Sequence, residues 1–175
     1  RRKGIRIAKP KVIIPLFPGT NCEYDTQAAF RAAGAEADVF VLRTANYAQV
    51  EESMEELSAR IRKSQILSLV GGFSGGDEPD GSGKFIISVL KNPKVKEAVM
   101  ELLENDGLIL GICNGFQALI KSGLLPTGRL ERPTPESPTL FRNEIGRHVS
   151  KMVRTKVVNN SSPWMRGFEV GAVYT

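Results

Sequence analysis

The stretch LILGICNGFQ, residues 108–117, joins an apolar run to Cys113, which has a glycine two residues before it and another two residues after it. An apolar run, a tight turn and a helix in this order are typical of a strand-to-helix junction in an α/β sheet. The two glycines relieve crowding at the turn, which leaves the side chain between them exposed on strained backbone. The helix N-terminus that follows favours negative charge and therefore the thiolate. We interpret Cys113 as a nucleophile on an elbow; the alternative is a buried strand cysteine whose glycines serve helix packing.

Apolar runs and helical segments alternate on the N-terminal side of this junction. We expect strands at residues 12–17, 37–42, 66–70 and 108–112, and helices at residues 21–33, 49–63, 93–105 and 116–122. Parallel strands that are covered on both faces are continuous apolar runs, as these four are. The pattern predicts an α/β protein with a mostly parallel sheet and helices on both faces, in which ligands bind beyond the carboxyl ends of the strands.

The alternation ends after Gly123. Residues 124–139 are rich in proline, threonine and glycine, and residues 140–158 contain strand-like stretches interrupted by charges. Residues 168–175 are typical of another strand, which stops without a turn or a polar tail. We expect strands in both of the last two stretches.

The basic residues gather at the start of the chain. With 175 residues, 41% of them hydrophobic, the chain is long enough for one sizeable core, which favours a single domain. The formal net charge is +5, but residues 1–11 hold six basic side chains and no acidic one, so the remainder is nearly neutral. We interpret residues 1–11 as a basic interdomain linker and residues 12–175 as the domain. Because the domain itself lacks a basic excess, we expect neither nucleic acid nor a membrane as a partner.

Two further features bear on the location of the protein. No stretch approaches the roughly 18 uninterrupted apolar residues of a membrane span, and the start does not resemble a secretory signal. The two cysteines, Cys22 and Cys113, lie far apart in the sequence and make no disulfide framework. We therefore expect a cytoplasmic protein.

A second glycine-rich stretch, GGFSGGD at residues 71–77, directly follows the third expected strand and so lies at the same edge of the sheet as Cys113. Its backbone amides, together with the amide of Asn114, could stabilise the oxyanion of a tetrahedral intermediate. The alternative is an ordinary flexible turn. A phosphate-binding loop is excluded, because Glu78 and Phe85 replace the glycine and the hydroxyl residue that a Walker motif needs.

The loop PGTNCE, residues 18–23, follows the first expected strand and lies on the same side of the sheet. Either Thr20 or Asn21 caps the next helix, or these residues face the substrate. Cys22 has no glycine-flanked turn, so we interpret it as a small packing residue.

Together these stretches make the chain resemble the class I, or triad, glutamine amidotransferases, and within them the glutaminase domains of phosphoribosylformylglycinamidine synthases. The similarity covers nearly the whole chain and rests on PGTNCEYD, GGFSGGDEPDGSGK, GICNGFQ and FRNE, which begin at residues 18, 71, 111 and 141. The resemblance implies a flavodoxin-like fold of the class I glutamine amidotransferase type, incomplete at its C-terminus.

The resemblance also implies roles for individual residues. Cys113 would attack the glutamine carboxamide and form a glutamyl thioester, with release of ammonia. The residues expected to bind the substrate or the oxyanion are Gly71, Gly72, Phe73, Asn114, Gln117 and Asn143. The domain itself would need no metal or cofactor. A synthase domain of the same chain, or a separate subunit, would use the ammonia with ATP and magnesium to convert formylglycinamide ribonucleotide into its amidine in purine biosynthesis.

The chain departs from the family pattern at the general base. Family members carry a His-x-Glu pair after a late strand, where the histidine deprotonates the cysteine and the acid orients the imidazole. The only histidine here is His148, whose neighbours two residues away are Gly146 and Ser150. We do not expect His148 to be catalytic, and we expect the pair a few residues beyond Thr175. The alternatives are another class I amidotransferase, a related cysteine hydrolase, or a non-catalytic module on the same fold.

These 175 residues alone should therefore show no appreciable glutaminase turnover. At neutral pH a free thiol is only a few per cent thiolate, and the leaving ammonia also needs a proton. The measurement is ammonia release from glutamine by this chain and by a longer product of the same gene that includes the next His-x-Glu, once both are shown to be folded. Comparable turnover of the two would place the general base within the present sequence.

Overall fold

The computed structural model describes residues 7–75, 77 and 83–175. The chain divides into two compact units, Arg1–Phe141 and Arg142–Thr175. The predicted basic linker lies mostly outside the described residues, and its last residue, Lys11, begins the first strand. The assignment of residues 12–175 to one domain stays a prediction. No helix in the described part of the chain is long and apolar enough to cross a membrane.

A four-stranded parallel sheet forms the centre of the first unit. Its strands are β1 (Lys11–Leu16), β3 (Glu36–Val41), β4 (Ile66–Leu69) and β6 (Leu108–Gly111), in the spatial order β3-β1-β4-β6. This is the order of a flavodoxin-like sheet, in which the chain starts inside the sheet and first pairs outward. The prediction of an α/β protein with a mostly parallel sheet is confirmed, and the four strands of this sheet begin and end within one residue of the predicted bounds.

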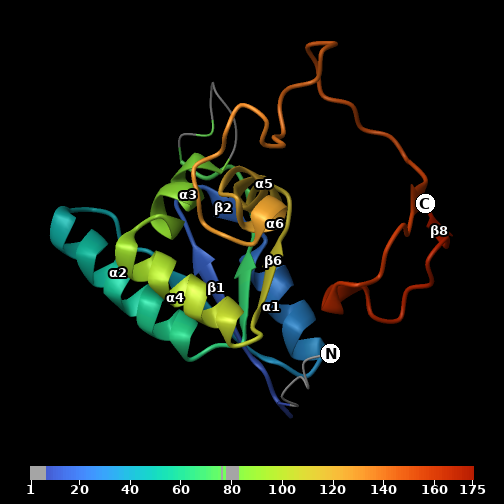
Figure 1. Cartoon of the computed structure of the whole chain (residues 1–175). Helices are drawn as coiled ribbons and strands as arrows, with labels where there is room; N and C mark the ends of the chain where they lie inside the picture. Colours follow the sequence, from blue (N-terminus) through green and yellow to red (C-terminus); the bar gives the residue numbers. More distant parts are fainter. Residues whose placement is uncertain (1–6, 76, 78–82) are drawn as a thin grey trace. The chain divides into compact units, whose positions relative to one another are not determined.

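Helices cover both faces of this sheet (Figure 1). α1 (Glu23–Ala32) lies on one side, and α2 (Tyr47–Arg62) and α4 (Pro93–Glu104) pack against each other on the other side. α5 (Asn114–Lys121) follows β6, as expected. The sequence did not predict α3 (Lys84–Leu90), because the glycine-rich stretch before it indicated a loop. The short α6 (Leu124–Thr127) follows α5.

Side-chain caps fix where α2 and α4 begin. The Oδ1 atom of Asn46 accepts a hydrogen bond from the amide of Gln49 at 3.0 Å, and the Oδ1 atom of Asn92 accepts one from the amide of Lys94 at 3.1 Å. Pro93 occupies the first turn of α4, where its missing N–H costs no intrahelical hydrogen bond. The local sequence therefore defines where both helices begin. Their stability then comes mainly from burial of their apolar faces against the core.

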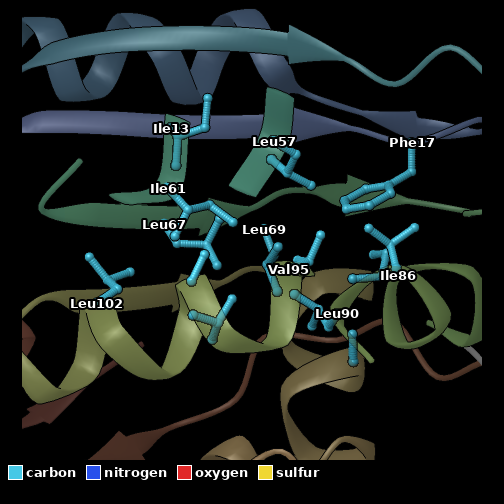
Figure 2. Packing of buried hydrophobic residues seen from close by; sticks show 14 of the residues in the cluster. Ile13, Phe17, Leu57, Ile61, Leu67, Leu69, Ile86, Leu90, Val95 and Leu102 are labelled. Atoms are coloured by element: carbon cyan, nitrogen blue, oxygen red, sulfur yellow. The ribbon is translucent and has the colours of Figure 1, made fainter. Parts of the chain in front are cut away.

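The core lies between the sheet and the layer that contains α2, α3, α4 and α5 (Figure 2). Leu67 and Leu69 of the central strand β4 are fully buried, and they pack in one cluster with Leu57 and Ile61 of α2 and with Val95 of α4. Because β4 is central, its position is fixed by apolar contacts along its whole length. The glycine-rich stretch that follows β4 therefore begins at a backbone position that the core holds fixed.

The second unit is mostly irregular. β7 (Thr155–Lys156) pairs antiparallel with β8 (Val173–Tyr174), and one turn of 3-10 helix, η1 (Pro163–Met165), lies between them in the sequence. The strands expected at residues 140–158 and 168–175 are confirmed only for these two short segments. Most side chains of this unit are exposed, so burial does not select extended structure elsewhere in it.

Replacing Leu67 by alanine should lower the free energy of unfolding by about 2–5 kcal/mol, because the change removes buried methyl groups from a packed core and leaves a cavity. Leu125→Ala on α6 is the matched control, since that side chain is 53% exposed and the expected cost is within about 0.5 kcal/mol. Urea unfolding curves measure both. Equal losses in the two variants would show that the core does not lie on this face of β4.

Candidate active site

Cys113 lies on the turn between β6 and α5. Its backbone angles, φ 52° and ψ −109°, lie in a region that residues with side chains rarely occupy. The side chain is exposed, and the amide of Gln117 donates to the carbonyl oxygen of Cys113 at 3.0 Å, so the helix begins directly after the turn. The expected strand, turn and helix are present, and the alternative of a buried strand cysteine is wrong.

Two close backbone approaches hold this turn. A Cβ atom on Gly115 would overlap the carbonyl oxygen of Leu69, and a Cβ atom on Gly111 would lie 2.8 Å from the carbonyl oxygen of Gly115. The amide of Gly115 also donates to the carbonyl oxygen of Val70 at 3.1 Å. The glycines on either side of Cys113 therefore let the start of α5 pack directly on the backbone at the end of β4.

The glycine-rich stretch after β4 approaches the thiol. β5 (Gly71–Gly72) pairs antiparallel with β2 (Thr20–Asn21). A Cβ atom on Gly71 would lie 3.3 Å from the Cβ atom and 3.9 Å from the Sγ atom of Cys113. Gly72 has a φ of 100°, and a Cβ atom there would lie 2.6 Å from a backbone nitrogen of β2. The structure therefore places Gly71 beside Cys113 and Gly72 against the backbone of β2, and the missing side chain of Gly71 leaves space beside the sulfur.

The candidate oxyanion donors are backbone amides. The amide of Phe73 donates to the carbonyl oxygen of Gly19 at 2.9 Å, so it already has an acceptor, and the side chain of Phe73 is 80% exposed. Asn114 is the first residue of α5, where amides have no intrahelical acceptor. Among the backbone amides of Gly72, Phe73 and Asn114, those of Gly72 and Asn114 are therefore the better candidates. Phe73 would have to give up its bond to Gly19 before it could take part.

The side chains of Asn114, Gln117 and Asp77 form a hydrogen-bonded group next to the turn. Asn114 is 1% exposed, and its Nδ2 atom donates to Oδ2 of Asp77 at 2.6 Å and to Oε1 of Gln117 at 3.4 Å. Gln117 is half-buried. Asn114 and Gln117 are residues that the sequence predicted for the site, whereas Asp77 had no individual role. An acidic residue that closes a glycine-rich stretch at a strand end was the signal that could have singled it out.

Neither Thr20 nor Asn21 caps α1, so the first alternative for this loop is wrong, and the second alternative, that these residues face the substrate, stays a prediction. The Oγ1 atom of Thr20 accepts from the amide of Phe17 at 3.0 Å and donates to the carbonyl oxygen of Phe17 at 2.7 Å, which closes the loop on itself. The N-cap residue of α1 is Cys22, whose backbone has a left-handed φ of 68°. The Oδ1 atom of Asn21 accepts a hydrogen bond from the amide of Cys22 and so supports this conformation. The side chain of Cys22 is exposed, so its interpretation as a packing residue is wrong.

Two residues considered in the sequence lie in the second unit. The Nδ2 atom of Asn143 donates to the carbonyl oxygen of Arg147 at 3.1 Å, and both Asn143 and His148 are exposed. The substrate-binding role of Asn143 stays a prediction. Among the residues that the structure describes, no group of three histidine, cysteine, aspartate or glutamate side chains could hold a metal ion.

Residues 9–174 match the family model of the CobB/CobQ-like glutamine amidotransferase domain. Because the match covers nearly the whole chain, the chain belongs to this family. It is 34% identical over 163 residues to the phosphoribosylformylglycinamidine synthase subunit PurQ of Sulfurimonas denitrificans, which corresponds to 93% of this chain and 60% of that protein. It is 38% identical over 120 residues to the PurQ subunit of Dehalococcoides mccartyi, which corresponds to 69% of this chain and 43% of that protein.

A solved structure, PurLQS from Thermotoga maritima, has a similar fold. The TM-score is 0.66 at 28% sequence identity, and the match covers 95% of this chain and 64% of that chain. The chain thus spans about 60% or less of the length of the two PurQ relatives. The family match and the structural match together confirm the glutamine amidotransferase fold that the sequence predicted.

Gly115→Ala should destabilise the protein by about 1–3 kcal/mol, because the new methyl group would overlap a carbonyl group of β4 and force α5 away from it. Gly75→Ala is the matched control in the neighbouring loop, where the nearest atom to a Cβ would be an oxygen 3.8 Å away. Thermal unfolding compares the two variants with the wild type. The packing described for the elbow is wrong if Gly115→Ala is as stable as Gly75→Ala.

Proposed function

We propose that the chain is the glutaminase part of a phosphoribosylformylglycinamidine synthase, which hydrolyses glutamine through a thioester on Cys113 and supplies the ammonia to an ATP-dependent synthase. The observation that carries the proposal is the exposed thiol of Cys113 on strained backbone, beside Gly71 and the first amide of α5. The family match supports glutamine as the nitrogen donor, and the similarity to PurQ subunits supports this particular synthase.

In the first half of the reaction, the thiolate of Cys113 forms a bond to the carboxamide carbon of glutamine. The π electrons of the C=O bond move to oxygen, and the amides of Gly72 and Asn114 would donate to this oxyanion. When the tetrahedral intermediate collapses, the C–N bond breaks, the nitrogen takes up a proton, and a glutamyl thioester remains. Donors that are strongest on the charged oxygen lower the barrier, because they stabilise the transition state more than the bound amide.

In the second half, water attacks the thioester carbon and loses a proton, and the C–S bond breaks to give glutamate and free Cys113. One group must therefore accept and donate protons in both halves, as a histidine oriented by an acid does in a triad. We assign this role to a His-x-Glu pair of the intact protein. We do not assign it to His148, which has no acid at that spacing.

The same residues would define where glutamine lies. Gly71 has no side chain to occupy the space beside the Sγ atom, so the carboxamide could approach the sulfur from this side. Gln117 stands one helical turn after Cys113 and is half-buried, which suits a polar contact to the substrate. We propose Gln117 as a binding residue, and we propose Asn143 as another on the resemblance to the family alone.

The ammonia would be consumed by a separate synthase activity, in the same chain or in another subunit. That activity would use ATP and magnesium to convert formylglycinamide ribonucleotide into its amidine in purine biosynthesis, while the glutaminase domain would need no cofactor. The similarity to a chain of the PurLQS structure supports a partner of this kind. Both cysteines are free thiols, which fits the proposed cytoplasmic location.

A glutamine-mimicking electrophile should label Cys113 of the intact protein and leave Cys22 unlabelled, although both thiols are exposed. Only Cys113 combines the elbow with a helix N-terminus and the neighbouring glycines. Mass spectrometry of the digested protein locates the label. The matched variants are Cys113→Ser, which should lose glutamine hydrolysis, and Cys22→Ser, which should keep it.

Label on Cys22 with Cys113 unmodified would overturn the assignment of the nucleophile. A separate outcome concerns the synthase. If the protein hydrolyses glutamine but the released ammonia never enters an ATP-dependent amidine-forming reaction, the chain is another amidotransferase or a related cysteine hydrolase.

A further inference from the structure

The buried carboxylate of Asp77 lies beside the elbow. Its side chain is 7% exposed, and three donors surround it. Oδ1 accepts from the amide of Gly83 at 2.7 Å and from the hydroxyl of Ser74 at 3.1 Å, and Oδ2 accepts from Nδ2 of Asn114 at 2.6 Å. A carboxylate is costly to bury without such bonds, and hydrogen bonds to a charged acceptor are stronger than those between neutral groups. These hydrogen bonds therefore fix the carboxylate of Asp77 relative to all three donors.

These donors belong to three different segments. Ser74 follows β5, Gly83 precedes α3, and Asn114 is the first residue of α5. The two candidate oxyanion donors, the amides of Gly72 and Asn114, stand on two of these segments. One carboxylate thus links the strand end that carries one donor to the helix start that carries the other.

The carboxylate of Asp77 sets the orientation of the Asn114 side chain. Its Nδ2 atom serves Asp77 and Gln117, while its Oδ1 atom is buried and has no hydrogen-bond partner among the described residues. Turning the amide over would direct Oδ1 at the carboxylate, where two acceptors would repel each other. The charge on Asp77 therefore fixes this side chain even though an oxygen is left unpaired, which costs stability.

We propose that Asp77 is a positioning residue of the active site: through Asn114 and Ser74 it holds the amides of Gly72 and Asn114 at the separation that the oxyanion requires. The inference rests on the proposed glutaminase function and adds a residue to it. We assign Asp77 no contact with the substrate or with the thiol. Its effect is on the transition state, because small displacements of preorganised donors weaken their interaction with the developing charge.

The test uses Asp77→Asn in the intact protein. Asparagine keeps the shape and an oxygen acceptor for Ser74 and Gly83, but its NH2 group then faces the Nδ2 atom of Asn114, so the hydrogen bond to a charged acceptor is lost. The turnover number for glutamine should fall about 100-fold, while KM stays within about threefold, because the lost interaction acts in the transition state. Alkylation of Cys113 by iodoacetamide should stay within about threefold of the wild-type rate, since displacement of iodide creates no oxyanion.

A second variant keeps the test informative if Asp77→Asn folds poorly. Asn114→Ala removes the same hydrogen bond from the other side and should give the same pattern, and the double variant should lose little more than the larger single loss. A purely structural role would instead slow alkylation and turnover together. That result, or normal turnover of folded Asp77→Asn in an active protein, would overturn this inference alone. A folded wild type without glutaminase activity would overturn the proposed function and this inference with it.

Discussion

The contact between Gly115 and the carbonyl group of Leu69 brings the first turn of α5 onto the backbone of β4, and the chain between β6 and α5 has to bend sharply to allow it. The bend lies at Cys113, whose backbone has a positive φ of 52°. Backbone strain of this kind costs of order 1–3 kcal/mol and persists only where the surroundings fix it. Here the buried side chains of Ala118 and Leu119 hold α5 against the core, so the packing of the helix keeps the thiol exposed on its turn.

The strand that anchors the elbow also anchors the glycine-rich stretch. β4 is buried along its length, and β5 follows it directly, so Gly71 and Cys113 are placed by the same part of the core. The β2–β5 ladder then fixes the strand end from the opposite side. Shared support of this kind explains how two segments about 40 residues apart in the sequence can place a thiol and a glycine backbone side by side with little freedom between them.

Much of this arrangement could be predicted because its causes are local. The apolar runs define the strands, and Gly111 and Gly115 define the elbow within five residues of sequence. What could not be predicted depends on contacts between distant residues. The bond between Asp77 and Asn114 spans 37 positions, and the bond of the Phe73 amide to Gly19 removes a donor that the pattern alone had suggested. Residues 142–175 bury few side chains, so their pattern carries little information about structure.

Detection of the covalent intermediate tests the role of Cys113 most directly. The intact protein would be mixed with glutamine, quenched with acid during turnover, digested, and analysed by mass spectrometry for the peptide that contains Cys113. We expect this peptide to gain the mass of one glutamyl group, in a linkage that hydroxylamine cleaves as it does a thioester. Steady glutamine hydrolysis with no acyl group on Cys113, or with the acyl group on another residue, would contradict the central claim that this cysteine is the nucleophile.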